Sequence, residues 1–234
     1  MSTVIDFHAH IIPGADHGCS STQEALGQLA MMREVGIETV VATPHFYPAQ
    51  HNVEDFISLV DMGVQAIKEN RSENEPKILL GAEILLCPNI HKMPDFEKLC
   101  IRGTRIFLLE LPTNGLTQEI VETVTEILSL DYTVILAHVD RYLKYYKEQI
   151  DELLARGALA QVNAGALKTK NLFRRKALLS YLESGCVVAF GSDLHEQNQK
   201  VMNAYAALTK LPNDLFAKIS NESEKLLANA EEVI

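Results

Sequence analysis

The sequence predicts an α/β fold in which seven strands form a parallel barrel, and three observations favour it. Short apolar runs rich in β-branched residues alternate with longer amphipathic runs, which is the pattern of repeated βα units. The 234 residues are an ordinary length for one α/β barrel, and no linker or fixed-period repeat divides them. With 47% hydrophobic and 22% charged residues, the composition is that of a globular protein with a sizeable core. We therefore expect one domain spanning residues 1–234.

Seven strands are expected because seven runs are short, apolar and bounded by polar or turn residues. They lie at residues 3–7 (TVIDF), 39–43 (TVVAT), 78–83 (ILLGAE), 105–110 (RIFLLE), 133–137 (TVILA), 159–163 (LAQVN) and 187–191 (VVAFG). An open doubly wound sheet would give the same alternation, so the pattern alone leaves it as an alternative. The chain has no G-x-G-x-x-G segment and no Walker A loop, however.

Helices are expected in the amphipathic runs between the strands. They lie at residues 22–35, 53–70, 117–130, 146–156, 172–184 and 197–209, with further helix near the C-terminus. The first begins at Ser21-x-x-Glu24, a capping box in which each side chain satisfies a backbone N–H of the other residue. Gly36, Gly157 and Gly185 each follow a helix and precede a strand, where a residue in the left-handed conformation ends the helix.

Charge and cysteine content exclude several functional classes. The net charge of −10 argues against a nucleic-acid-binding surface, because that surface must be basic. No run approaches the roughly 18 to 20 consecutive apolar residues of a membrane span, and the N-terminus leads into a strand without a basic signal region. We expect no membrane insertion and a cytoplasmic location. The cysteines form no C-x-x-C pair and are interpreted as reduced thiols; they are Cys19, Cys87, Cys100 and Cys186.

Side chains that can bind metal follow almost every predicted strand. In a parallel barrel the C-terminal ends of the strands meet at one rim, where catalytic groups collect. Five of the eight histidines stand at these exits, and six of the seven exits carry His, Asp or Glu. The exits read Asp6-Phe7-His8-Ala9-His10, Thr43-Pro44-His45, Glu83, Glu110, His138, Asn163 and Asp193-Leu194-His195. The sequence therefore predicts a metal site at this rim, with Asn163 as the poorest ligand.

The types and spacing of these ligands indicate more than one ion. Histidine with carboxylate suits Mn²⁺, Fe or Zn²⁺ better than Mg²⁺ or Ca²⁺, which prefer oxygen ligands. His8 and His10 point to the same side of an extended segment, and so do Asp193 and His195. These pairs and two glutamates exceed the ligands that one ion takes, so we expect two or three ions.

Each of these residues alone has an ordinary structural explanation. A single histidine at a strand end is more often hydrogen-bonded than metal-bound, and Glu83 or Glu110 alone would be an ordinary rim carboxylate. The joint occurrence of so many at one rim favours the metal site. His51 and His91 lie outside the pattern and are interpreted as surface or lid histidines.

The motifs resemble those of the PHP (polymerase and histidinol phosphatase) superfamily. They are His8-x-His10, Thr43-Pro44-His45, Gly81-Ala82-Glu83, Ala137-His138-x-x-Arg141 and Ser192-Asp193-x-His195. The stretches at residues 12–18 (IPGADHG) and 42–46 (ATPHF) are similar to the capsular-polysaccharide tyrosine phosphatases of the CpsB type. The resemblance covers nearly the whole chain. It implies a distorted (β/α)7 TIM-like barrel of the PHP type and a trinuclear site, often served by Mn²⁺.

The resemblance also implies which residues hold each ion. The first ion would be held by His8, His10, Glu83 and Asp193. The second would be held by Glu83, Glu110 and His138, so that Glu83 bridges the two. The third would be held by Asp16, His45 and His195. The family usually has Asp where this chain has His17, which is therefore interpreted as a replacement ligand, a proton donor or a bystander.

The mechanism that we hypothesise is hydrolysis of a phosphomonoester by a metal-bridging hydroxide. Bound ions lower the pKa of water toward roughly 7 and neutralise phosphoryl oxygens. Arg141, three residues after His138, is the candidate for binding the remaining phosphoryl oxygens as a bidentate fork, with a surface salt bridge as the alternative. No Cys-x5-Arg loop is present, which argues against a phosphocysteine intermediate. The substrate implied by the resemblance is a phosphotyrosine-bearing protein, such as the tail of a tyrosine kinase of exopolysaccharide or capsule biosynthesis.

A dense basic run follows the sixth predicted strand in this acidic chain. It runs from residue 168 to 176 (KTKNLFRRK), and a solvated helix start is its ordinary explanation. We hypothesise that it attracts an anionic phosphoprotein tail. The candidate substrate-binding residues are Lys168, Lys170, Arg174 and Arg175, with Lys200 assisting.

Three alternatives share some of these features. A PHP phosphatase or phosphodiesterase for a small metabolite, such as histidinol phosphate, would have the same fold and ligands. An amidohydrolase is disfavoured because Glu110 ends the fourth strand, where that group often has lysine. A non-catalytic metal-binding regulatory module is disfavoured by the complete ligand set. The sequence is compatible with an oligomer.

Overall fold

The strands of the computed structural model, which describes residues 4–211 and 214–234, form two parallel sheets. One sheet has the order β1-β2-β4 and the other the order β3-β5-β6-β7-β8-β9. The strand bounds are β1 Ile5–Ala9, β2 Thr39–Ala42, β3 His45–Phe46, β4 Lys77–Leu80, β5 Glu83–Leu85, β6 Ile106–Glu110, β7 Thr133–Leu136, β8 Leu159–Asn163 and β9 Val187–Gly191. Parallel pairing of consecutive strands requires crossover connections, which the helices supply.

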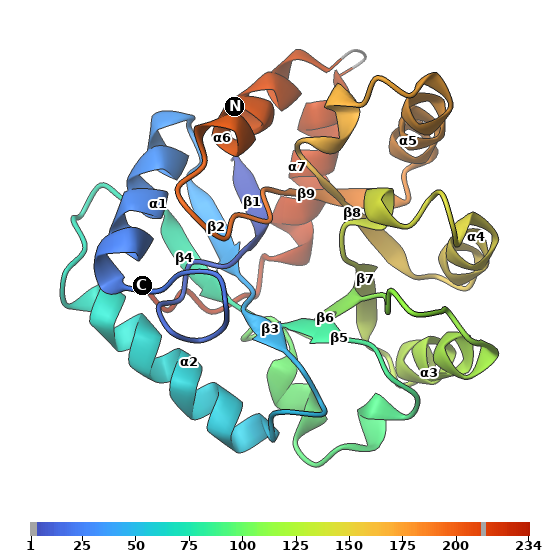
Figure 1. The fold of residues 1–234 in the computed structure, drawn as a ribbon, viewed down its shortest axis with the longest axis horizontal. Helices are drawn as coiled ribbons and strands as arrows, with labels where there is room; N and C mark the ends of the chain where they lie inside the picture. The colour runs from blue at the N-terminus through green and yellow to red at the C-terminus, as the bar shows by residue number, and fades with distance from the viewer. Residues whose placement is uncertain (1–3, 212–213) are drawn as a thin grey trace.

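Seven α-helices in the described residues lie around the outside of the strands (Figure 1). Their bounds are α1 Thr22–Glu34, α2 Val53–Lys68, α3 Gln118–Ser129, α4 Lys147–Ala155, α5 Leu172–Ser184, α6 Gln199–Ala206 and α7 Leu215–Leu226. Short 3-10 helices lie at Ile90–Lys92 (η1), Phe96–Leu99 (η2), Val139–Arg141 (η3), Ala166–Lys168 (η4) and Ala207–Lys210 (η5). None of the helices among the described residues is long and apolar enough to cross a membrane.

The strands are apolar on both faces because both faces are buried. Phe7, Leu108 and Ile135 belong to one buried cluster, which is contributed mainly by the strands. Their neighbours Phe107 and Leu136 point the opposite way and belong to the larger cluster, which includes the buried faces of the helices. This arrangement leaves the C-terminal ends of the strands as the place where polar side chains gather.

Two of the predicted strands are interrupted near their C-terminal ends. The strand expected at 39–43 ends at Ala42 and a second strand starts at His45, while the strand expected at 78–83 ends at Leu80 and β5 starts at Glu83. Both predicted boundaries were wrong. Thr43-Pro44 separates β2 from β3, and proline has no N–H to continue the pairing. The interruptions place His45 directly opposite Glu83 in the β3–β5 register.

The rim ends of β1 and β9 are joined by backbone hydrogen bonds. The Asp193 N–H donates to the His8 carbonyl oxygen at 2.8 Å, and the His10 N–H donates to the Leu194 carbonyl oxygen at 2.9 Å. These bonds bring together the two pairs of candidate metal ligands from opposite ends of the chain.

The predicted helices agree with the structure to within three residues at each end, and the range 197–209 is divided between α6 and η5. Strand 3–7 is found as β1 from Ile5, and Thr3 lies outside the described residues. The capping box is half formed: Ser21 Oγ accepts from the Glu24 N–H at 3.2 Å, but the Glu24 carboxylate accepts from Ser20 instead of Ser21. Gly36 and Gly185 have φ of +86° and +81°, the left-handed conformation that was predicted.

Candidate metal centre

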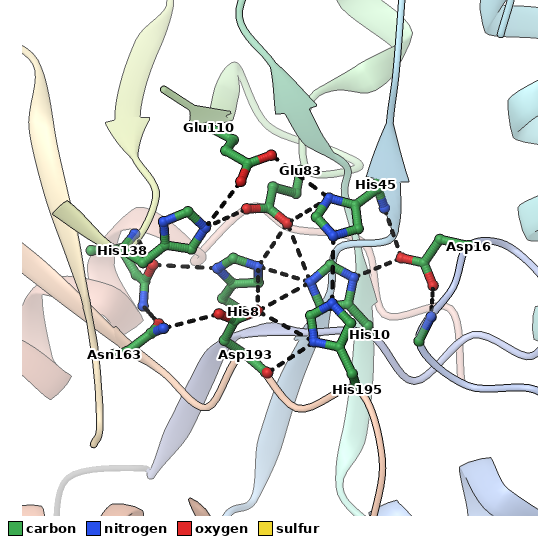
Figure 2. A network of polar contacts seen from close by, with 12 residues as sticks. His8, His10, Asp16, His45, Glu83, Glu110, His138, Asn163, Asp193 and His195 are labelled. Atoms are coloured by element: carbon green, nitrogen blue, oxygen red, sulfur yellow. Dashed lines mark hydrogen bonds and ion pairs between the residues drawn. The ribbon is translucent and has the colours of Figure 1, made fainter. Parts of the chain in front are cut away.

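One polar cluster collects the side chains that were predicted to bind metal at the strand exits (Figure 2). The histidines and carboxylates lie on six strands (β1, β3, β5, β6, β7 and β9) or just beyond them, and most are buried. They are His8, His10, His45, Glu83, Glu110, His138, Asp193 and His195. Residues from position 8 to position 195 of the chain therefore meet at one place.

Glu83 is the centre of this cluster. Its Oε1 lies 2.6 Å from His138 Nε2. Its Oε2 lies 2.9 Å from His45 Nδ1 and 3.2 Å from the Nε2 atoms of both His8 and His10. The side chain is fully buried, and its two oxygens are thus shared by four imidazoles.

The donor set fits divalent cations. Three-residue groups with ligand atoms within 4.8 Å of one another are His10/His45/His195, His8/His10/Asp193, His8/Glu83/His138 and His45/Glu83/Glu110. Glu83 Oε2, Asp193 Oδ1 and His45 Nδ1 are buried and have ion-pair contacts but no hydrogen bond among the described residues. His138 Nδ1 is buried with no hydrogen-bond partner there either. Burying polar atoms without partners is costly, and cations coordinated by those atoms would remove much of the cost.

Several candidate ligands have the charge state that a metal-binding side chain needs. Burial raises the pKa of Glu83, but the charge on His8 and the hydrogen bonds with three other histidines together outweigh burial and hold the pKa well below its usual value. Burial also raises the pKa of Asp193, but the hydrogen bond with His10 and the nearby positive charges, that of His8 first, outweigh burial and hold the pKa below its usual value. Burial and the charge on His10 lower the pKa of His195 to about 4. At neutral pH both carboxylates are ionised and His195 is neutral.

Asp16 and His17 lie at the edge of the cluster. Asp16 Oδ2 accepts from the His45 backbone N–H at 2.9 Å and lies 2.6 Å from His10 Nδ1. Asp16 belongs to none of the four three-residue groups, but it contacts His10 and His45, which do belong to them. The His17 ring stacks on the ring of His45 at 4.8 Å between centroids and is exposed. Gly18 is tightly constrained, because a Cβ atom there would lie 2.5 Å from His10 Cβ.

Arg141 contacts the cluster by an ion pair with Asp193. Its Nη2 donates to Asp193 Oδ2, and its Nη1 lies 3.4 Å from His138 Nε2, while its side chain is 47% exposed. His138 and Asp193 have φ of +31° and +55°. Positive φ is uncommon outside glycine and often marks functional sites. Arg141 therefore lies beside the candidate ligands, with about half of its side chain exposed.

The basic residues of the predicted tail-binding run are in different environments. Arg174 Nη2 donates to the Asp140 carbonyl oxygen at 2.8 Å and lies 3.3 Å from Asp140 Oδ2, so it is tied to η3. The other three candidate residues of the run are exposed: Lys168 on η4, Lys170 between η4 and α5, and Arg175 in the first turn of α5. Lys200 is exposed on α6, and among the described residues its side chain makes no hydrogen bond or ion pair with the cluster.

Two side chains of β8 form a hydrogen-bond network with the candidate ligands that was not predicted from the sequence. Gln161 Oε1 accepts from the His138 backbone N–H at 2.6 Å and lies 3.3 Å from His8 Nδ1. Its Nε2 donates to Asn163 Oδ1 at 3.0 Å, and Asn163 Nδ2 donates to Asp193 Oδ2 at 2.9 Å. Asn163, predicted to be the poorest ligand, thus holds the side chain of the candidate ligand Asp193. The signal was a glutamine within the apolar β8 run, on the same face as Asn163.

Replacing Gln161 with methionine should destabilise the protein and weaken metal binding. The loss leaves the His138 N–H without an acceptor, which we expect to lower the free energy of unfolding by roughly 1–3 kcal/mol. Partners that orient ligand histidines typically change metal affinity by about 10–100-fold. Denaturant unfolding and metal titration measure the two effects.

The matched control is Gln28→Met in α1. Gln28 is equally buried, but neither polar atom of its amide has a hydrogen-bond partner among the described residues. Removing an unpartnered polar group should leave stability unchanged or increase it. Equal effects of the two substitutions would argue against the role of Gln161.

Known proteins resemble the chain over most of its length. The family model described as capsular polysaccharide synthesis, CpsB/CapC, matches residues 4–234. The tyrosine-protein phosphatase CpsB of Streptococcus pneumoniae is 25% identical over 225 residues, covering 88% of this chain and 90% of that protein. The protein of the same name from Streptococcus agalactiae is 22% identical over 201 residues, covering 82% and 83%.

A solved structure matches the fold. It comes from the crystal structures of YwqE from Bacillus subtilis and CpsB from Streptococcus pneumoniae, described as metal-dependent tyrosine phosphatases. The superposition has a TM-score of 0.76 at 21% identity and covers 98% of this chain and 96% of that one. At this identity the likeness establishes the α/β fold with parallel strands.

Proposed function

This chain belongs to the CpsB/CapC family of capsular polysaccharide synthesis, and on that premise we propose that it is a metal-dependent protein-tyrosine phosphatase. Relatives that bear this activity in their names match most of the chain. The observation that carries the proposal is Glu83, a buried carboxylate whose two oxygens face four imidazoles. A purely structural core would gain little from such a concentration of charge.

The proposed cofactors are two or three divalent ions, with Mn²⁺ preferred to Fe or Zn²⁺ because the ligands mix imidazole and carboxylate. Bound ions would lower the pKa of coordinated water and neutralise charge on phosphoryl oxygens. The ligand sets that we propose are His8, His10, Glu83 and Asp193; Glu83, Glu110 and His138; and Asp16, His45 and His195. Support for Asp16 is its position against His10 and His45.

Arg141 is the proposed phosphoryl-binding residue. Its guanidinium is anchored on one side by Asp193 and is about half exposed on the other. A planar guanidinium can donate two parallel hydrogen bonds to a phosphoryl group. His17, exposed and stacked on His45, is the candidate proton donor to the leaving oxygen. A phenol leaving group needs little such help, because its pKa is about 10.

For the fold we propose a distorted (β/α)7 barrel of the PHP type. In this interpretation β2 with β3, and β4 with β5, each count as one interrupted strand. The backbone bonds that join His8 and His10 to Asp193 and Leu194 support closure between the first strand and the last. If the strands close in this way, the chain forms one metallohydrolase domain spanning residues 1–234.

The proposed substrate is the phosphotyrosine tail of a capsule-synthesis kinase in the cytoplasm. The test compares three substrates with Mn²⁺ present: a phosphotyrosine peptide, histidinol phosphate and an aryl phosphodiester. We expect fastest turnover of the peptide and, by elemental analysis, at least two ions per chain. Preferred hydrolysis of histidinol phosphate would assign a metabolite phosphatase instead. Metal binding with no hydrolysis of any substrate would favour a non-catalytic module.

A further inference from the structure

An exposed apolar pair lies within the basic run at the start of α5. Leu172 is 76% exposed and Phe173 is 89% exposed. One exposed apolar residue is ordinary, but two adjacent ones this open form a contiguous patch of the kind that marks a contact with a partner. We call the exposed residues here the α5 surface; they are Lys168, Lys170, Leu172, Phe173, Arg175 and Lys176.

The α5 surface is strongly positive in an acidic protein. Residues 164–182 contain five Lys or Arg and no Asp or Glu, whereas the whole chain has a net charge of −10. Within residues 4–211 and 214–234, the side chains of Lys168, Lys170, Arg175 and Lys176 form no ion pair. The cations therefore remain available to an anionic partner.

The α5 surface adjoins the metal centre. It follows β8, whose last residue, Asn163, donates to Asp193 at 2.9 Å. Arg174, in the middle of the run, donates to the Asp140 carbonyl oxygen at 2.8 Å and so ties α5 to the 3-10 turn that ends at Arg141. A chain whose phosphate meets Arg141 would therefore have its flanking residues near the α5 surface.

We propose that the α5 surface docks an acidic segment of the phosphoprotein substrate, with an apolar side chain of that segment packed on Leu172 and Phe173. The proposal rests on the proposed phosphatase activity and names the feature that selects the substrate. Charge complementarity steers the acidic segment, and the apolar contact holds it. The hydrogen bond between Arg174 and Asp140 of η3 fixes the α5 surface beside the candidate metal centre. A peptide that also reaches that centre requires this placement, whereas an anionic membrane does not, so a peptide is the favoured partner.

The test uses the double variant Phe173→Ser/Lys176→Glu. Its matched control, Met62→Ser/Lys68→Glu, changes an apolar residue that is 71% exposed and an exposed lysine on α2. The substrates are an aryl phosphate, a phosphotyrosine peptide flanked by Asp, Glu and Leu, and the same peptide flanked by Ser. For the α5 variant we expect KM on the acidic peptide to rise about tenfold, with kcat unchanged. The aryl phosphate, the serine-flanked peptide and the control variant should show no change.

Other outcomes separate this proposal from the activity on which it rests. An equal loss on all three substrates, or no difference between the two peptides for the original chain, would refute docking while the phosphatase activity stands. If nothing is hydrolysed, the phosphatase proposal fails, and fluorescence anisotropy with the acidic peptide still tests the α5 surface. Binding to phosphatidylserine vesicles that the double variant loses, with unchanged peptide kinetics, would assign the surface to a membrane.

Discussion

Glu83→Gln should remove most of the bound metal and lower kcat/KM by about 10³-fold or more. The amide keeps the shape of the side chain but removes the negative charge that faces His8, His10, His45 and His138. It also replaces one ligand oxygen with an NH₂ group, which donates and cannot coordinate. Charge stabilisation by bound cations contributes several kcal/mol, and about 4 kcal/mol corresponds to about 10³-fold.

Elemental analysis and hydrolysis of an aryl phosphate measure the two losses. Glu126→Gln is the matched control, because Glu126 also pairs with a histidine, His91, at 2.9 Å, but is half exposed on α3. The control should keep its metal and its rate. A Glu83→Gln protein with full metal content and full activity would contradict the central role of this carboxylate.

The order and type of the secondary-structure elements follow from the sequence because apolar periodicity is a local property. Each strand of the two parallel sheets is buried on both faces, so its apolar run is continuous and bounded by polar residues. The strand breaks at Thr43-Pro44 and Gly81-Ala82 were not predicted, although Pro44 marks the first and Gly81 the second. Their consequence, the pairing of His45 with Glu83, depends on register between strands, which one strand's sequence does not contain.

The convergence of the candidate ligands was predictable, but their grouping was not. That the exits of parallel strands meet at one rim is general for this architecture, so residues as distant as His8 and His195 could be placed together. Which nitrogen faces which oxygen depends on side-chain geometry. The contacts of Asp16 with His10 and His45, and of Gln161 with His138, required coordinates.

For Arg141 too, the position near the site could be predicted from the sequence, but its contacts could not. Its spacing from His138 suggested a phosphate-binding role, but only the structure reveals its ion pair with Asp193. This pair does two things: it lowers the pKa of Asp193, after the larger effects of His10 and His8, and it holds the guanidinium beside the ligands. A substrate phosphate would thus meet a cation that is already oriented, which reduces the entropy lost on binding.

Arg141→Ala should therefore lower kcat/KM by about 10²–10³-fold, the typical effect of losing one donor to a developing anion, while the metal content stays the same. Both a higher KM and a lower kcat are expected, because the guanidinium would contact the phosphoryl group before and during its transfer. Steady-state kinetics on an aryl phosphate, with elemental analysis of the same sample, separate the two roles of the side chain. Loss of metal together with activity would mean that Arg141 acts through Asp193 and not on the substrate.

The control for this substitution is Arg156→Ala at the end of α4. Arg156 is 41% exposed, close to the 47% of Arg141, and it also pairs with a carboxylate, Glu152 at 2.7 Å. Removing a comparable surface ion pair should cost at most about 1 kcal/mol of stability and leave the kinetics unchanged. Because both variants lose one half-exposed arginine from an ion pair, a kinetic difference between them isolates what the position beside Asp193 contributes. Arg141→Ala kinetics no different from those of Arg156→Ala would remove Arg141 from the site.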